Sequence, residues 1–166
     1  MSVNIAVLTV TDTRTFDNDK SGAILVSKIK EAKHNLVDRK ICKDNKDDIV
    51  EILKNWTSEK NIDVIITTGG TGLTGRDITP EAIDEIADKK IPGFGEIFRN
   101  ISLKTVGTSA IQSRACAALS NGKYIFALPG SSGGVTDAWE EILKFQLDIN
   151  HKPCNFVELF PRLKEK

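Results

Sequence analysis

The chain has 166 residues, of which 40% are hydrophobic and 28% are charged, so we expect one soluble domain spanning residues 1–166 with a sizeable core. The 23 Lys and Arg residues balance the 23 Asp and Glu residues, which argues against a nucleic-acid binder that works by bulk phosphate neutralisation. The three cysteines and two histidines are spaced neither as a disulfide framework nor as a zinc site.

In chain order, apolar runs typical of buried strands alternate with segments of helical periodicity. The predicted elements are a strand at 5–10, a helix at 21–33, an outer strand at 36–42, a helix at 45–56, a strand at 62–67, helices at 79–90, 93–103 and 109–119, a strand at 123–128 and a helix at 135–147. Asp19 or Ser21 can cap the first helix, Asn45 the second, and Thr79 the third, where Pro80 follows at the first helical position. The tail from Asn150 onward is expected to be irregular.

This alternation predicts an α/β fold with a mostly parallel sheet that is covered by helices on both faces. Ligands of such sheets bind at the carboxyl ends of the strands. The apolar runs are shorter than the roughly 20 residues of a membrane span, and the N-terminal residues do not have the pattern of a signal peptide. We therefore expect a cytoplasmic protein without a membrane partner.

A glycine-rich loop from Thr68 to Asp77 follows the third predicted strand. Its glycines, Gly69, Gly70 and Gly72, let the backbone bend sharply and approach a ligand, and its N–H groups with the Thr71 hydroxyl can hold an anion. The spacing matches neither a Walker A loop nor GxGxxG. A plain tight turn is the alternative interpretation.

Three carboxylates fall at the expected binding edge. Asp77 is a candidate Mg²⁺ ligand, or else only a charge ahead of a helix N-terminus. A second magnesium ligand could be Asp44, which follows the second strand, or Asp12, which follows the first. By spacing alone, a turn or capping role for these two aspartates is the alternative.

A second glycine-rich loop, Pro129 to Gly134, follows the last predicted strand, and it contains Gly130 and Ser131. Two such loops on one sheet edge suit a ligand with more than one phosphate. Ser113-Arg114 lies in a predicted helix, where Arg114 is either a solvated side chain or an anion contact.

The order of these motifs resembles the MoaB/MogA family of molybdopterin-handling proteins. The resemblance rests chiefly on Thr67 to Gly72 with Arg76 to Ala82, and it extends to Leu8 to Asp12, Asp19 to Gly22, Gly107 to Ser109 with Ser113-Arg114, and Leu128 to Ser131. Gly93 to Arg99, Pro129 to Ser131 and Lys152 to Phe156 look closer to the MoaB branch.

The resemblance implies a three-layer α/β/α fold, trimers or hexamers, and adenylylation of molybdopterin by ATP with Mg²⁺, followed by hand-over to a MoeA-like molybdate-inserting protein. It implies that Asp77 and Asp44 are the catalytic and metal-binding carboxylates. It assigns the substrate pocket to Gly69, Gly70, Thr71, Gly72, Ser21-Gly22, Ser113-Arg114 and Gly130-Ser131. Asp12 and Pro129, which lie within the similar stretches, complete the expected substrate-binding set.

Two further hypotheses remain open at this point. The chain could be a non-catalytic molybdopterin-binding or scaffold protein of the same pathway, in which Asp77 is only a helix-start charge. It could also be a nucleotide-binding regulatory module that binds no pterin.

Overall fold

A computed structural model describes residues 1–165 and shows a six-stranded sheet in the order β2-β1-β3-β6-β5-β4. The strands are β1 (Asn4–Val10), β2 (Asn35–Cys42), β3 (Val64–Thr68), β4 (Lys89–Lys90), β5 (Cys116–Ser120) and β6 (Lys123–Leu128). The first four in sheet order are parallel, whereas β5 pairs antiparallel with β6 and β4 pairs antiparallel with β5. The expected mostly parallel sheet is therefore confirmed, with β2 at its edge.

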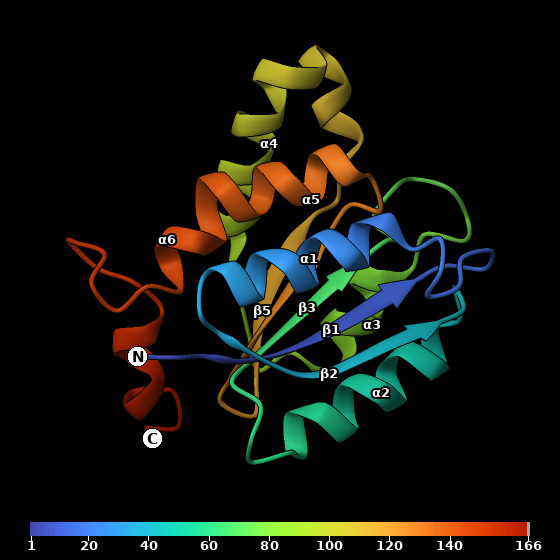
Figure 1. The fold of residues 1–166 in the computed structure, drawn as a ribbon. Helices are drawn as coiled ribbons and strands as arrows, with labels where there is room; N and C mark the ends of the chain where they lie inside the picture. Colours follow the sequence, from blue (N-terminus) through green and yellow to red (C-terminus); the bar gives the residue numbers. More distant parts are fainter. Residues whose placement is uncertain (166) are drawn as a thin grey trace.

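Helices cover both faces of this sheet (Figure 1). The helices are α1 (Lys20–Glu31), α2 (Lys46–Ser58), α3 (Thr79–Ile86), α4 (Pro92–Val106), α5 (Ser132–Ala138) and α6 (Lys144–Gln146). A π-helical turn, η2 (Trp139–Leu143), joins α5 to α6, and the 3₁₀ helices are η1 (Gly107–Gln112) and η3 (Val157–Arg162).

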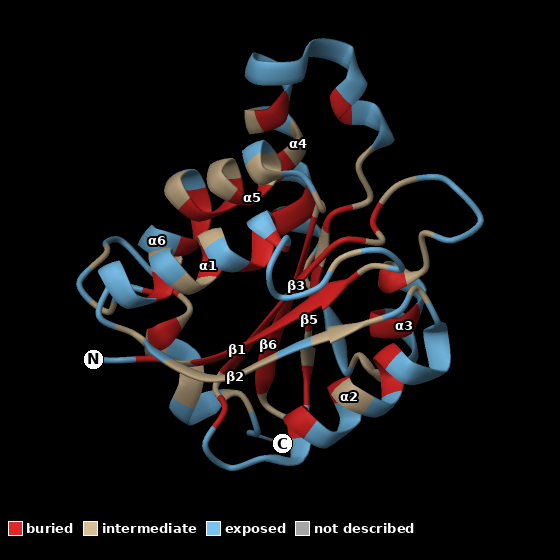
Figure 2. Cartoon of the chain, turned by 45° about the vertical axis from the view of Figure 1, so that its right-hand side comes forward, coloured by how far each residue is buried: buried red, intermediate tan, exposed pale blue. Residues whose placement is uncertain are grey.

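The core consists of two apolar layers, one on each side of the sheet. Helices α1, α4 and α5 pack on one face through side chains such as Ile29, Phe98 and Val135. Helices α2 and α3 pack on the other face through side chains such as Leu53 and Ile83. Figure 2 shows the resulting pattern, with β1, β3 and β6 buried and β2 only half-buried. This is the expected three-layer arrangement.

Local capping chemistry explains where the first two helices begin. The Asp19 carboxylate accepts a hydrogen bond from the Gly22 N–H at 2.9 Å, and the Asn45 side chain accepts one from the Asp48 N–H at 3.1 Å. Asp19, and not Ser21, is thus the cap of α1.

Thr79 does not cap α3, contrary to expectation. It lies inside the helix, and the preceding residue, Ile78, makes no capping hydrogen bond with its side chain. The Thr79 hydroxyl instead donates to the Gly69 carbonyl at 2.9 Å, which ties the helix start to the glycine loop. The same helix ends at Ile86 and not near Lys90, because the chain turns into β4.

The predicted helix at residues 109–119 is wrong. Its first part is the short η1, and its second part is β5, which pairs antiparallel with β6. The turn between these strands is Asn121-Gly122, whose φ angles of 49° and 73° are both positive, as a type I′ hairpin turn requires. Cross-strand pairing therefore overrides the helical preference of the alanines in this segment.

Two smaller differences concern the C-terminal third. The second glycine loop is shorter than expected, because Ser131 caps α5 and Gly133 and Gly134 already belong to that helix. The tail is not wholly irregular, since it contains η3, and its Phe156 and Phe160 rings pack against Tyr124.

Both ends of the described chain lie by the amino ends of the parallel strands. The N-terminal residues lead into the start of β1, and the Lys164 ammonium donates to Asn121 in the turn that precedes β6. The loops that form the site lie at the opposite edge, away from the N and C labels in Figure 1. None of the helices within residues 1–165 has the length and apolar character that a membrane crossing demands.

Candidate functional site

A cavity of about 630 Å³ lies at the carboxyl ends of β1, β3 and β6. The chain passes from β1 to β2 on one side and later to β3 on the other, so the cavity lies where the strand order reverses. Its walls are the segment after β1, the glycine loop after β3 and the loop after β6. The sequence places both glycine-rich loops at this edge, and the structure brings them into contact, since the Thr68 hydroxyl donates to the Pro129 carbonyl at 2.8 Å.

The glycine loop passes close to the neighbouring strand. Gly69 has a φ of 102°, and a Cβ there would lie 2.2 Å from the backbone oxygen of Val10. No side chain fits at this point. Within residues 1–165, the N–H groups of Gly70 and Thr71 donate no hydrogen bond, so they are free to bind a ligand in the cavity that both residues line.

Asp77 folds the outer part of this loop and lines the cavity. Its carboxylate accepts hydrogen bonds from the Thr74 N–H at 2.9 Å and the Thr74 hydroxyl at 2.7 Å. Burial alone would raise the pKa of Asp77, but these hydrogen bonds, one from the Gly72 N–H and the charge of Arg114 hold that pKa below its ordinary value. Asp77 is therefore a charged carboxylate at neutral pH.

Arg114 does not line the cavity but contacts the outer side of the glycine loop. It follows η1 in an irregular segment and not in a helix, which corrects the prediction for Ser113-Arg114. Its guanidinium donates to the carbonyls of Gly72 and Asp77 and forms an ion pair with Glu81. Ser113 lines the cavity, whereas Arg114 does not, and the anion contact expected of Arg114 stays a prediction.

Asp44 is the second carboxylate that lines the cavity. Burial and the negative charges of Asp12 and Asp77 raise the pKa of Asp44, and the charge of Arg76 opposes them only partly. Asp12 stands behind Asp44, where it accepts the Asp44 N–H at 3.2 Å and pairs with Arg76. It does not line the cavity itself.

A magnesium ion fits this donor set. Within the described residues, no three His, Cys, Asp or Glu side chains form a complete metal cluster. Mg²⁺ usually needs only one or two carboxylates and completes its shell with water and substrate phosphates. Asp44 and Asp77 supply two carboxylates that line one cavity, and after burial the neighbouring charges of Asp12 and Asp77 contribute to the raised pKa of Asp44.

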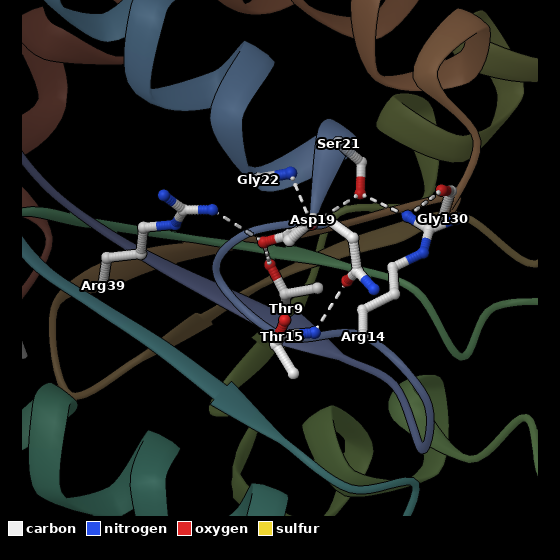
Figure 3. A network of polar contacts seen from close by, with 9 residues as sticks. Thr9, Arg14, Thr15, Asp19, Ser21, Gly22, Arg39 and Gly130 are labelled. Atoms are coloured by element: carbon white, nitrogen blue, oxygen red, sulfur yellow. Dashed lines mark hydrogen bonds and ion pairs between the residues drawn. The ribbon is translucent and has the colours of Figure 1, made fainter.

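The wall of the cavity opposite Asp44 and Asp77 is held by hydrogen bonds to a buried carboxylate, Asp19, as Figure 3 shows. Asp19 accepts from the Thr9 hydroxyl at 2.7 Å, from Ser21 at 3.3 Å and from Arg39 at 2.9 Å. Gly22 belongs to the same cap, where a Cβ would lie 2.1 Å from the Asp19 carboxylate, so it shapes the wall without lining it. Ser21, Pro129, Gly130 and Ser131 line the cavity.

Several lining residues escaped the sequence interpretation. The segment after β1 contributes Thr11, Thr13 and Arg14, and the end of η1 contributes Gln112. The Arg14 guanidinium reaches across the cavity wall, where its Nη1 donates to the Ser21 hydroxyl and to the Gly130 carbonyl, both at 3.2 Å. The available signal was the polar run that follows the first buried strand, but this run contains no glycine to mark it.

The chain is similar to known proteins over its whole length. Residues 6–148 match the family model described as a probable molybdopterin binding domain. A relative named molybdenum cofactor biosynthesis protein B, from Escherichia coli K12, is 43% identical over 161 residues, which cover 97% of this chain and 93% of the relative.

Solved structures agree with this similarity. A crystal structure of a molybdenum cofactor biosynthesis protein B has a TM-score of 0.89 at 37% identity and covers 100% of this chain and 98% of its own. That of the tungsten cofactor synthesizing protein MoaB from Pyrococcus furiosus has a TM-score of 0.77 at 34% identity and covers 86% and 91%.

Proposed function

Because this chain belongs to the family of probable molybdopterin-binding domains, we propose that it acts in molybdenum cofactor biosynthesis by adenylylating molybdopterin with ATP. The products are adenylylated molybdopterin and pyrophosphate. The observation that carries this proposal is the cavity itself, in which two carboxylates, Asp44 and Asp77, lie beside the free N–H groups of Gly70 and Thr71.

The reaction joins two anions. A phosphate oxygen of molybdopterin attacks the α-phosphorus of ATP, and the bond from that phosphorus to the bridging oxygen of the β-phosphate breaks as pyrophosphate leaves. A terminal phosphate is largely ionised at pH 7, so no strong base is required. The protein must hold the two groups in line and offset their repulsion.

The residues of the cavity are suited to this positioning. The free N–H groups of Gly70 and Thr71 can donate to phosphate oxygens, while Arg114 and Thr79 keep the loop in place from outside. Asp44 and Asp77 would hold Mg²⁺. When bound, Mg²⁺ neutralises charge on the triphosphate and on the departing pyrophosphate.

The test is adenylyl transfer by the purified protein with molybdopterin, ATP and Mg²⁺, followed by detection of adenylylated molybdopterin and pyrophosphate. We expect Asp77→Asn and Asp44→Asn to abolish turnover while molybdopterin still binds. Asp84→Asn is the matched control, because Asp84 is an exposed carboxylate of α3 that does not line this cavity. Equal activity of all three variants would overturn the proposal.

One observation favours a non-catalytic binding or scaffold protein as the second candidate. One oxygen of the Asp77 carboxylate, Oδ2, is already engaged by both the N–H and the hydroxyl of Thr74, which is a loop-shaping role. Tight binding of molybdopterin without any product in the same assay would establish this second candidate. Binding of ATP without molybdopterin would point to a nucleotide-binding module.

Two proposals concern partners. We propose that copies of the chain associate into trimers or hexamers, and that the product passes to a MoeA-like molybdate-inserting protein. The first of these proposals is supported by large apolar side chains that are exposed on α4 and η1, among them Leu103, Val106 and Ile111. Sedimentation velocity of the wild type and of Ile111→Ser measures the oligomeric state, and a monomeric wild type would refute the first proposal.

A further inference from the structure

Arg14 is the only cationic side chain that lines the cavity, among the residues that the structure describes. The other charged groups in its wall are the Asp44 and Asp77 carboxylates. Those carboxylates lie beside Gly70 and Gly72 of the glycine loop. Arg14 instead contacts Ser21 at the start of α1 and Gly130 in the loop after β6, so positive and negative charge lie at different parts of one cavity.

The Arg14 guanidinium is held in place, but most of its hydrogen-bond donors have no partner within residues 1–165. A single nitrogen, Nη1, makes both of its contacts, each at 3.2 Å and each to a neutral oxygen (Figure 3). Within residues 1–165, Nη2 and Nε donate no hydrogen bond, although a guanidinium carries five N–H donors. Both nitrogens retain solvent access, since neither is among the buried atoms without a partner.

Among residues 1–165 the charge of Arg14 has no carboxylate partner, unlike that of the other arginines around the cavity. Arg39 pairs with Asp19, Arg76 with Asp12 and Arg114 with Glu81. Arg14 approaches Asp19 only through the Ser21 hydroxyl, and the charge of Asp19 is already matched by Arg39 at 2.9 Å. A half-buried guanidinium anchored by two neutral acceptors presents a free, fork-shaped donor edge to an anion.

We propose that Arg14 binds the terminal monoester phosphate of molybdopterin and makes the site selective for the phosphorylated pterin. This inference rests on the proposed adenylyl transfer, in which the triphosphate of ATP is matched by the magnesium carboxylates. The second anion, the monoester phosphate, then needs a cation of its own.

The charge of the phosphate changes during the reaction. A monoester phosphate carries close to two negative charges at neutral pH, and one of them is lost from that phosphate when its oxygen bonds to the AMP phosphorus. The attraction of Arg14 for this group therefore weakens after transfer. Arg14 favours the substrate over the product and assists product release.

The test combines a change in the protein with a change in the ligand. Binding of molybdopterin and of molybdopterin dephosphorylated by a phosphatase is measured for the wild type, Arg14→Gln and Arg14→Lys. Lys20→Gln is the matched control, because Lys20 is an exposed cation of the same region that does not line the cavity. Thermal denaturation of each variant verifies that it is folded.

We expect Arg14→Gln to weaken binding of molybdopterin about 10- to 100-fold and to leave binding of the dephosphorylated form unchanged. Arg14→Lys should retain part of the affinity, and Lys20→Gln all of it. In turnover, the KM for molybdopterin should rise in Arg14→Gln while the KM for ATP stays constant.

Three results would overturn the role of Arg14: equal losses for both pterins, no loss for either, or a rise in the KM for ATP alone. Equal losses of affinity for the two pterins would mean that Arg14 only stabilises the conformation of the segment after β1. The proposed function fails separately, if the wild type binds molybdopterin in this phosphate-dependent way but yields no adenylylated product. Absence of any molybdopterin binding by the wild type would refute both.

Discussion

Replacing Asp19 by Asn should destabilise the protein by about 3 kcal/mol, because the change affects a fully buried hub of hydrogen bonds. The Asp19 side chain is 0% exposed, and its Oδ2 accepts from the Thr9 hydroxyl and from Arg39. An Asn that keeps its oxygen towards Gly22 would turn an NH₂ group towards Thr9 and Arg39. The Thr9 hydroxyl can rotate and accept from that group, but the Arg39 guanidinium has only donors and loses its ion pair. Removing one partner of a buried ion pair costs roughly 3–5 kcal/mol, and the 21% exposure of Arg39 places the loss near the lower end.

The same carboxylate predicts a dependence on pH. Burial alone would raise the pKa of Asp19, but hydrogen bonds from Thr9, Gly22 and Arg39, with the charge of Arg39, hold it below its ordinary value. Since the folded-state pKa is lowered, this stabilisation is complete above the unfolded-state pKa of about 3.9 and is lost as the pH falls through the folded-state pKa. The difference in unfolding free energy between wild type and Asp19→Asn should thus be constant from about pH 5 to 7 and shrink below about pH 4.

Urea unfolding followed by tryptophan fluorescence at several pH values measures this difference. Asp17→Asn is the matched control, because Asp17 is an exposed residue of the same segment and should change stability by no more than about 0.5 kcal/mol. The reasoning would be refuted if Asp19→Asn were as stable as Asp17→Asn, or if its deficit did not depend on pH.

Three further predictions, which involve five substitutions, have definite expected outcomes. Thr67→Val should leave the free energy of unfolding in urea unchanged or raise it by about 0.5–1 kcal/mol, because the buried Thr67 hydroxyl has no hydrogen-bond partner within residues 1–165. Thr9→Val should instead lower it by about 1–2 kcal/mol, because the hydrogen bond to Asp19 is lost. Gly69→Ala should cost more than about 3 kcal/mol or prevent folding, since its Cβ would meet the Val10 backbone. Gly122→Ala should cost only about 1–2 kcal/mol, because its Cβ meets only the Lys164 side chain, which can move aside, and its positive φ accounts for the loss; similar losses in the two variants would contradict the geometry. Arg114→Gln should increase amide hydrogen exchange in residues 72–78 and leave that of β1 unchanged, and unaltered exchange in the loop would show that Arg114 does not hold it.

The fold was largely predictable because buried parallel strands are uniformly apolar. Residues 5–10, 62–67 and 123–128 lie in the centre of the sheet, and each was recognisable as such a run. The expected resemblance to the MoaB/MogA family is also confirmed. The failure at Cys116 to Ser120 has a clear cause, because alanine favours helices and a strand near the sheet edge has no long apolar run. The Asn121-Gly122 pair was the better signal there, since it is the strongest short mark of a hairpin.

The site was predictable where chemistry coincides with unusual backbone, and not elsewhere. The glycine loop and its Asp77 were found because glycines and a carboxylate follow a buried strand. Arg14 was missed because a lone arginine in a polar segment carries no local mark of its contact with Gly130, which is 116 residues away in the chain. The supporting role of Arg114 depends equally on tertiary contacts, with Gly72 and Asp77, that no spacing in the sequence encodes.

The two ends of the described chain, residues 1–165, lie at the edge of the sheet remote from the cavity. A strand of six residues is about 20 Å long, so a flexible linker attached to either end must pass only about that distance before it reaches the mouth of the cavity. A partner domain joined by such a linker would leave the mouth open and would meet any ligand released from the cavity at an effective concentration on the order of millimolar. The topology is therefore compatible with tandem fusions, in which a ligand released from one domain reaches the next before it diffuses away.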